Sequence, residues 1–152
     1  MTAFERDRAA CLALYLREPP TPPLEGLRDA LYQAWLRLSA EDPDQTAAAC
    51  GLLREAPWGF CPYSGVPAVQ ILTAWGDRLP PDVRGLLLSF LREGRSGWLA
   101  ELEKGACNSF RLLAAASLLG CGLLLEDREA AGRGEEALAW TEAHLEGYDL
   151  PD

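Results

Sequence analysis

Apolar residues recur every three or four positions along most of the chain, and prolines or glycines separate the periodic segments. This spacing is typical of amphipathic α-helices, and no stretch alternates as a half-buried strand does. We therefore predict an all-α fold, with residues 1–152 forming a single helical domain. The expected helices cover residues 3–17, 23–38, 43–54, 67–75, 80–92, 96–104, 108–125 and 128–146.

Local signals mark where several of these helices begin. Thr2 and Glu5 form the Thr-x-x-Glu pattern of a capping box, in which each side chain caps the other residue's amide. Asp42 followed by Pro43 is typical of an N-cap and the first helical position. Asn108 is expected to cap the helix over residues 108–125.

The last two predicted helices, in residues 108–147, form the clearest antiparallel pair. Residues 108–125 are apolar on nearly every side, whereas residues 128–146 are amphipathic. Gly120 and Gly122 each weaken the first helix by about 1 kcal/mol relative to alanine. We therefore expect another helix to cross close to these two glycines.

Short strings recur at intervals of about forty residues. Leu-Arg-Glu begins at Leu16, Leu53 and Leu91, and Ala-Trp ends at Trp35 and Trp75. With eight helices, this spacing predicts stacked antiparallel pairs, as in an α-solenoid or a partial α/α toroid. The four expected pairs are residues 1–38, 43–76, 81–104 and 108–147.

The net charge of −9, without any basic stripe, makes nucleic acid and anionic membranes unfavourable partners. The five cysteines include no Cys-x-x-Cys pair, so we expect no disulfide framework, metal or cofactor. Cys11, Cys50 and Cys121 lie among alanine and leucine and are expected to act as small apolar side chains. The N-terminus lacks a secretion signal, and the longest apolar run is shorter than the roughly 20 residues that span a bilayer, so we expect a cytoplasmic protein.

Residues 56–65 are the most irregular segment, with two prolines and two glycines. Trp58, Phe60 and Tyr63 lie within it, and aromatic side chains are costly to leave in water. The segment is therefore expected either to fold back on the core or to line a pocket.

The C-terminal sequence resembles one helix pair of the α/α-toroid polysaccharide lyases, of the heparinase II/III-like or alginate-lyase-like kind. The resemblance lies in Cys107-Asn108-Ser109-Phe110, Leu118-Leu119-Gly120, Glu126-Asp127-Arg128-Glu129, Ala137-Leu138-Ala139-Trp140 and Gly147-Tyr148-Asp149-Leu150-Pro151-Asp152. It implies an inner and an outer helix of a partial toroid, and a catalytic role for Asn108 in neutralising a uronate carboxylate. Tyrosine and histidine are the base and acid of such lyases, whereas the sole histidine here, His144, lies in the middle of a helix.

Each candidate site residue also has a purely structural interpretation. Asn108 is either a carboxylate neutraliser or a simple helix cap. Trp58, Tyr63 and Trp98 either stack on sugar rings or pack in the core. Arg111, three residues after Asn108, is the basic residue best placed to attract an acidic sugar.

Two functions follow from these patterns. The first is a carbohydrate-binding or carbohydrate-processing protein with an oligosaccharide ligand. The alternative is a non-catalytic helical-repeat module that binds a protein partner or a second copy of itself.

Overall fold

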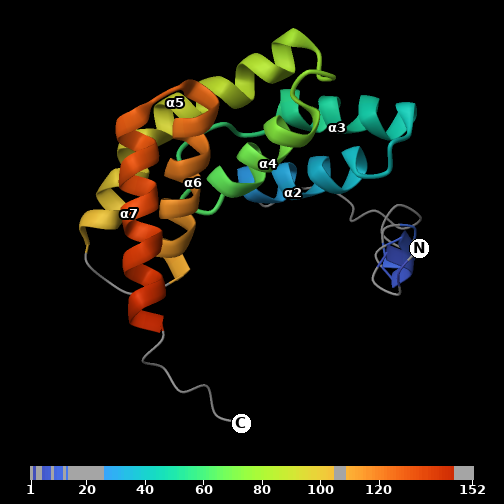
Figure 1. The fold of residues 1–152 in the computed structure, drawn as a ribbon. Coiled ribbons are helices and arrows are strands. Elements are labelled where there is room, and N and C mark those ends of the chain that lie inside the picture. Colours follow the sequence, from blue (N-terminus) through green and yellow to red (C-terminus); the bar gives the residue numbers. More distant parts are fainter. Residues whose placement is uncertain are drawn as a thin grey trace. The chain divides into compact units, whose positions relative to one another are not determined.

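The computed structural model describes residues 2, 5–7, 9–11, 13, 26–104 and 109–145. Within these ranges the regular structure is helical and no strand occurs, which confirms the all-α prediction. The helices run in the order α2 (Leu27–Leu38), α3 (Pro43–Glu55), α4 (Gly65–Trp75), α5 (Pro81–Glu103), α6 (Ser109–Leu125) and α7 (Arg128–Leu145), as Figure 1 shows. The chain divides into two compact units, Met1–Pro57 and Trp58–Asp152, which are described separately below.

In the first unit, α2 packs against α3. Leu31 and Ala34 of α2 and Ala49 and Leu53 of α3 are all fully buried. Burial of these apolar side chains is the main favourable contribution to the packing of the two helices. The aliphatic faces that the sequence pattern predicts for α2 and α3 are therefore core faces.

Two of the predicted helix starts in this unit are confirmed. The Glu5 amide donates to Thr2 Oγ1 at 3.2 Å, and the Thr2 amide donates to Glu5 Oε2 at 2.6 Å, which completes the capping box. Asp42 Oδ1 accepts from the amide of Gln45 at 2.9 Å, with Pro43 as the first helical residue.

The helix predicted over residues 23–38 begins at Leu27 in the structure. Gly26, its N-cap, has φ 155°, a conformation that residues with a side chain rarely adopt. Residues 23–25 and the predicted cap Asn108 lie outside the described residues.

In the second unit, α6 packs against α4, α5 and α7. Its inward-facing residues are mostly small: Ala114, Ala115 and Ser117 are fully buried, as are Leu118 and Cys121. Small side chains allow helix backbones to approach closely, so α6 can contact three neighbouring helices. α6 and α7 form the predicted antiparallel pair, side by side in Figure 1.

The predicted close crossing at Gly120 and Gly122 is confirmed. A Cβ atom at Gly122 would lie 2.3 Å from the amide nitrogen of Ala131 in α7. A Cβ atom at Gly120 would lie 2.4 Å from Cγ1 of Val69 in α4. Both distances are too short for real carbon contacts, so these glycines allow α4 and α7 to reach α6.

The predicted break between residues 92 and 96 is wrong, because α5 is one continuous helix of 23 residues. Within this helix, Gly94 and Gly97 serve aromatic packing. A Cβ atom at Gly94 would lie 2.7 Å from the Trp98 ring, and one at Gly97 would lie 2.3 Å from the Phe60 ring. The glycines make room for rings and do not end the helix.

The repeat of four helix pairs is not found in the predicted form. Residues 81–104 contain one helix where a pair was expected. The expected pair in residues 43–76 is divided between the two units, and α3 packs against α2. Of the pairs that can be compared, residues 108–147 are the one that matches the prediction.

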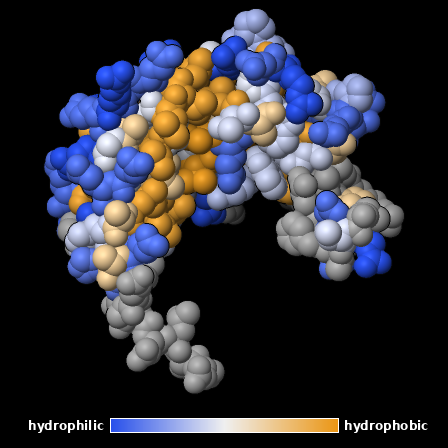
Figure 2. Space-filling view, in the orientation of Figure 1, coloured by the Kyte–Doolittle hydropathy of each residue, from blue (hydrophilic) through white to orange (hydrophobic). Residues whose placement is uncertain are grey.

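One edge of α6 faces solvent. It carries Leu112, Ala116, Leu119 and Leu123, which are spaced four, three and four residues apart and therefore lie on one side of the helix. Leu112 is 42% exposed and Leu123 is 69% exposed, and the two residues between them are half-buried. We call these four residues the α6 stripe; Figure 2 shows a continuous hydrophobic band along α6.

Two glycines of α7 provide a matched test of the close α6–α7 packing. Gly134→Ala is expected to lower the free energy of unfolding by about 1–3 kcal/mol, because the added Cβ would meet the backbone of α6. The nearest atom is the amide nitrogen of Leu119, at 2.5 Å. Gly132→Ala is expected to raise the free energy of unfolding by about 0.5–1 kcal/mol, because no atom lies within 4 Å of the added carbon. Urea titration of both variants measures the difference, and equal effects would contradict the packing described here.

Candidate functional site

A cluster of aromatic rings connects the irregular segment 56–65 to α5. Trp98 meets Phe90 edge to face, with ring centroids 5.7 Å apart and an interplanar angle of 82°. Phe60 is tilted against Trp98 at 6.2 Å, and Trp58 is tilted against Phe90 at 5.6 Å. Such tilted and edge-to-face pairs are favourable for aromatic rings. The segment therefore folds back on α5, as one of the two alternatives from sequence predicted.

Trp98 lies at the centre of this cluster and is fully buried. Small residues surround its ring: a Cβ atom at Gly65 would lie 2.7 Å from Trp98 Cζ2 and 2.2 Å from Ser117 Oγ. The prediction that Trp98 stacks on a sugar is therefore wrong, because neither face of the indole is accessible. Its role is to join α4, α5 and α6 in the core.

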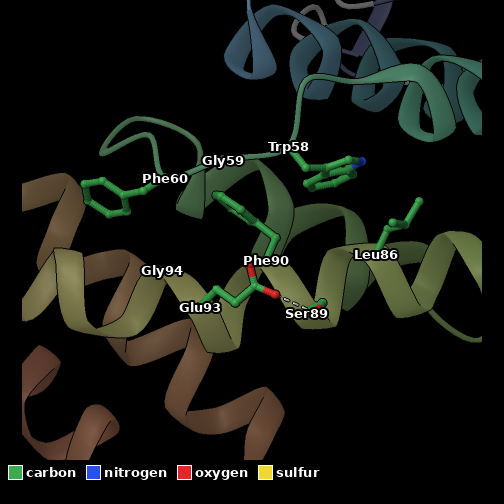
Figure 3. Close-up of a pocket in the computed structure, with 8 residues that line it drawn as sticks. All are labelled: Trp58, Gly59, Phe60, Leu86, Ser89, Phe90, Glu93 and Gly94. Atoms are coloured by element: carbon green, nitrogen blue, oxygen red, sulfur yellow. Dashed lines mark hydrogen bonds between the residues drawn. The ribbon is translucent and has the colours of Figure 1, made fainter.

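Beside the cluster lies an open pocket of about 300 Å³. Its lining comes from the loop and from one side of α5, as Figure 3 shows: Trp58, Gly59, Phe60, Leu86, Ser89, Phe90, Glu93 and Gly94. Both sequence alternatives for segment 56–65 thus hold, because its aromatic residues pack on α5 and also line a pocket.

The pocket combines aromatic walls with one polar corner. Ser89 Oγ donates to Glu93 Oε1 at 3.0 Å, and Glu93 is the one ionisable side chain among the lining residues. A small ligand with an apolar face and hydrogen-bond donors fits this lining better than an anion does. Sequence patterns did not reveal Ser89, Phe90 and Glu93, because they lie on an ordinary amphipathic helix.

The other predicted binding residues lie away from this pocket and have structural partners. Tyr63 is tilted against Phe110, with ring centroids 4.8 Å apart. Arg111 Nη1 donates to the carbonyl oxygen of Leu102 at 2.5 Å, and its guanidinium carbon lies 4.3 Å from the centroid of the Trp140 ring. Arg111 thus links the end of α5 to α7 through a hydrogen bond and a cation–π contact.

Asn108, the predicted catalytic residue, lies outside the described residues. His144, the sole histidine, stacks on Trp140 with ring centroids 3.8 Å apart, and its Nδ1 lies 2.7 Å from the carbonyl oxygen of Trp140. These contacts occupy one face of the imidazole and one ring nitrogen within α7. The described part of the chain contains no group of three or more potential metal ligands.

The structure explains why the pKa of the Asp127 carboxyl group is lowered. Asp127 Oδ1 accepts from the amide of Ala130 at 3.0 Å and caps α7, and its Oδ2 lies 2.6 Å from Arg95 Nε of α5. The amide hydrogen bond, followed by the contact with Arg95, lowers the pKa of Asp127 below its usual range. Hydrogen bonds to Asp127 and to Glu129 raise the pKa of Arg95 in turn. This network joins α5 to the turn between α6 and α7.

The four described cysteines differ in exposure, and Cys61 is half-buried. Cys50 and Cys121 are buried, as predicted, whereas Cys11 is exposed and that prediction is wrong. Burial raises the pKa of the Cys121 thiol, whose Sγ lies 3.4 Å from the carbonyl oxygen of Leu91. Cys121 is therefore a protonated core side chain at neutral pH and not a nucleophile.

The α6 stripe differs from the pocket in size and in chemistry. α4 contains no charged residue, and Arg111, the one charged residue of α6, makes the contacts described above on another side of the helix. In a chain of which 24% is charged, a continuous uncharged apolar edge is unusual for a surface exposed only to water. Residues 108–125 are apolar on nearly every side, and the structure leaves one of these apolar sides exposed.

The Asp127 network predicts a pH-dependent stability. A carboxyl group with a lowered folded-state pKa stabilises the fold above its unfolded pKa of about 3.9, and this contribution disappears as pH falls through the folded value. Asp127→Asn keeps a capping oxygen but removes the charge. We expect this variant to be less stable than the wild type at pH 7, with a difference that shrinks below about pH 4. Urea titrations across this range measure the difference.

Asp77→Asn is the control, because the Asp77 side chain is 97% exposed and meets Arg84 only at 3.6 Å. Its stability is expected to follow the wild type at every pH. A difference between Asp127→Asn and the wild type that stays constant from neutral to acid pH would contradict the role of the Asp127 charge.

Comparison with known proteins leaves the family open. No protein-family model, curated protein or solved structure matches the chain. The resemblance of residues 107–152 to polysaccharide lyases therefore remains a prediction. Across the described ranges, the helices are too short or too polar to cross a bilayer.

Proposed function

We propose that this chain is a helical protein-interaction module and that the α6 stripe is its docking face. The observation that carries the proposal is the exposure of Leu112 and Leu123 on a helix edge without charges. Apolar surfaces of this kind mark protein–protein contacts more often than surfaces open to water. The alternative function inferred from sequence, a non-catalytic helical module, thus gains support from the geometry.

Burial of the α6 stripe by a partner would be favourable in free energy. Full burial of a leucine side chain contributes roughly 1.5–3 kcal/mol relative to exposure. Since Leu112 and Leu123 are only partly exposed, covering each of them would contribute about 1–2 kcal/mol. Ala116 between them leaves room for a large side chain of the partner, as in knobs-into-holes packing.

The stripe is also held in place by the rest of the second unit. α6 contacts α4 through Gly120 and α7 through Gly122, and Leu118 on its inner side is fully buried. A docking helix with this support loses little conformational entropy when a partner binds. Binding of a partner to the stripe is therefore not opposed by the entropy cost of ordering α6.

Leu123→Glu is the direct test of the docking face. A carboxylate at the most exposed position of the stripe should lower the affinity for a partner at least about tenfold, because the charge would be desolvated on binding. A partner that copurifies with the wild type should be identified, produced separately and titrated against both proteins by calorimetry.

Tyr32→Glu provides the matched control, because Tyr32 is a 45% exposed aromatic residue of α2 in the first unit. It should leave the affinity for the same purified partner unchanged. Equal affinities of the wild type and Leu123→Glu would exclude the stripe as the docking face.

A second candidate function is the binding of a saccharide in the Trp58 pocket. The observation that favours it is the combination of the Trp58 and Phe60 rings with the Ser89–Glu93 pair. Sugar rings stack on aromatic faces, and their hydroxyls donate to carboxylates. Because Glu93 is negative, this pocket supports a neutral sugar more than the uronate that the lyase resemblance implies.

Calorimetric titration with neutral and acidic oligosaccharides tests this second function. We expect neutral sugars to bind more tightly than uronates, and Trp58→Ala to weaken binding by about tenfold or more through loss of stacking. Leu123→Glu should bind the sugar as the wild type does. Tighter binding of uronates, or the same affinity in Trp58→Ala, would rule out a neutral-sugar site in this pocket.

A further inference from the structure

We infer that the partner of the α6 stripe is an amphipathic helix that carries lysine or arginine along the flank facing α7. This inference rests on the proposed function, and it adds the chemical class of the partner. It follows from the spacing of the stripe and from the charges that border it.

The stripe has the geometry of a helix-binding seam. Spacings of four, three and four residues from Leu112 to Leu123 keep the four side chains along one line of α6. Eleven residues of helix span roughly 17 Å, the length of about three turns of a partner helix. An apolar helix face with anchors at i, i+3 or i+4, and i+7 is the usual complement of such a seam.

One border of the stripe is formed by α7. Ala131, Glu135, Leu138 and Glu142 follow the same four-three-four spacing and share one side of that helix. Ala131 lies against Gly122, next to Leu123 in α6, and both Ala131 and Leu138 are half-buried. Glu135 and Glu142 are exposed beyond them.

The contacts of α5 show which side of α7 borders the stripe. Glu129 and Trp140 lie on the other side of α7, where they meet Arg95 of α5 and Arg111 of α6. Because α5 covers the inner side of α6, as the contact from Cys121 to Leu91 shows, the side with Glu135 and Glu142 faces outward beside the stripe.

The charges on this border are predominantly negative. Glu135 and Glu142 flank the stripe, and Arg128, at the start of α7, is the cation on that side of the helix. On the opposite border α4 has no charge, with Gln70 and Thr73 exposed. Lysine or arginine side chains on the flank of the partner helix that faces α7 would therefore be attracted by these glutamates. The flank that faces α4 needs no charge.

The same charges disfavour a second copy of this chain as the partner. A two-fold antiparallel pairing of two stripes would place the α7 border of one copy against the α7 border of the other. Gly134 lies against Ala115 and Leu119, near the middle of the stripe, so Glu135 would then lie close to its own equivalent. The total charge of −9 adds further repulsion between two copies. Complementarity thus favours a basic helix over self-association.

Three synthetic peptides test the inference against the 152-residue chain. The first is an 18-residue helix-forming peptide with leucine at heptad seam positions and lysine on the flanks (about five turns of helix). The second has glutamate in place of every lysine, and the third has the lysine peptide's composition in scrambled order. Fluorescence anisotropy at low and high salt gives the three affinities.

We expect the lysine peptide to bind at least about tenfold more tightly than the other two. Leu123→Glu should abolish this binding or weaken it about tenfold, whereas Tyr32→Glu should not change it. The double variant Glu135→Gln and Glu142→Gln should weaken it and reduce its salt dependence, because it removes the acidic border while keeping side-chain size.

Failure of the inference can be distinguished from failure of the docking face. If the lysine and glutamate peptides bind equally and Leu123→Glu weakens both, the stripe docks helices without regard to charge and the inference is overturned. If light scattering shows a dimer that Leu123→Glu dissociates, the occupant is a second copy and the inference is again overturned. If the lysine peptide binds Leu123→Glu as it binds the wild type, the stripe is not the docking face and the proposed function fails as well.

Discussion

Close packing of α6 against three neighbouring helices is the constraint on which the second unit depends. α4 and α7 each reach α6 at a glycine, and apart from Leu118 the fully buried residues of α6 are alanine, serine and one cysteine. These small side chains contribute little apolar area individually, so stability depends on short interhelical distances maintained along the whole helix. A methyl group added at Gly122 or Gly134 would meet backbone, which cannot move away as a side chain can.

A helix covered on three sides has one side left, and in α6 that side is apolar. The inner face of α6 packs against other helices of the same unit, whereas Leu112 and Leu123 are exposed to water. The Trp98 ring shows the opposite outcome, because glycines at positions 65 and 94 leave room for it to be fully buried. The difference between the buried Trp98 ring and the exposed leucines of the stripe is the structural basis for placing the docking face on α6.

Much of the helical architecture was predictable from local sequence. The Thr2–Glu5 box, the Asp42 cap and the pair α6–α7 follow from capping chemistry and helical periodicity, which depend on neighbouring residues alone. The break expected within α5 was wrong because Gly94 and Gly97 have a tertiary role, next to Trp98 and Phe60, that periodicity does not contain. The pairing of α3 with α2 likewise depends on contacts between elements.

The candidate sites were predicted less well than the helices. Trp58 was identified as a pocket residue, but Trp98 proved to be buried and Arg111 holds α5 to α7. The α6 stripe was not predicted, because a nearly uniform apolar helix shows no sequence asymmetry that marks the uncovered side. Which side remains open is decided by where α4, α5 and α7 pack.

Solvent access to leucine methyl groups tests the central claim most directly. With methyl-labelled leucine and a soluble paramagnetic probe, NMR relaxation reports the exposure of each leucine side chain in the 152-residue chain. Strong relaxation enhancement is expected at Leu123 and Leu112, and none at Leu118 on the inner face of α6. Equal protection of Leu123 and Leu118 in a monomeric sample would contradict it, because the chain itself would then cover the stripe.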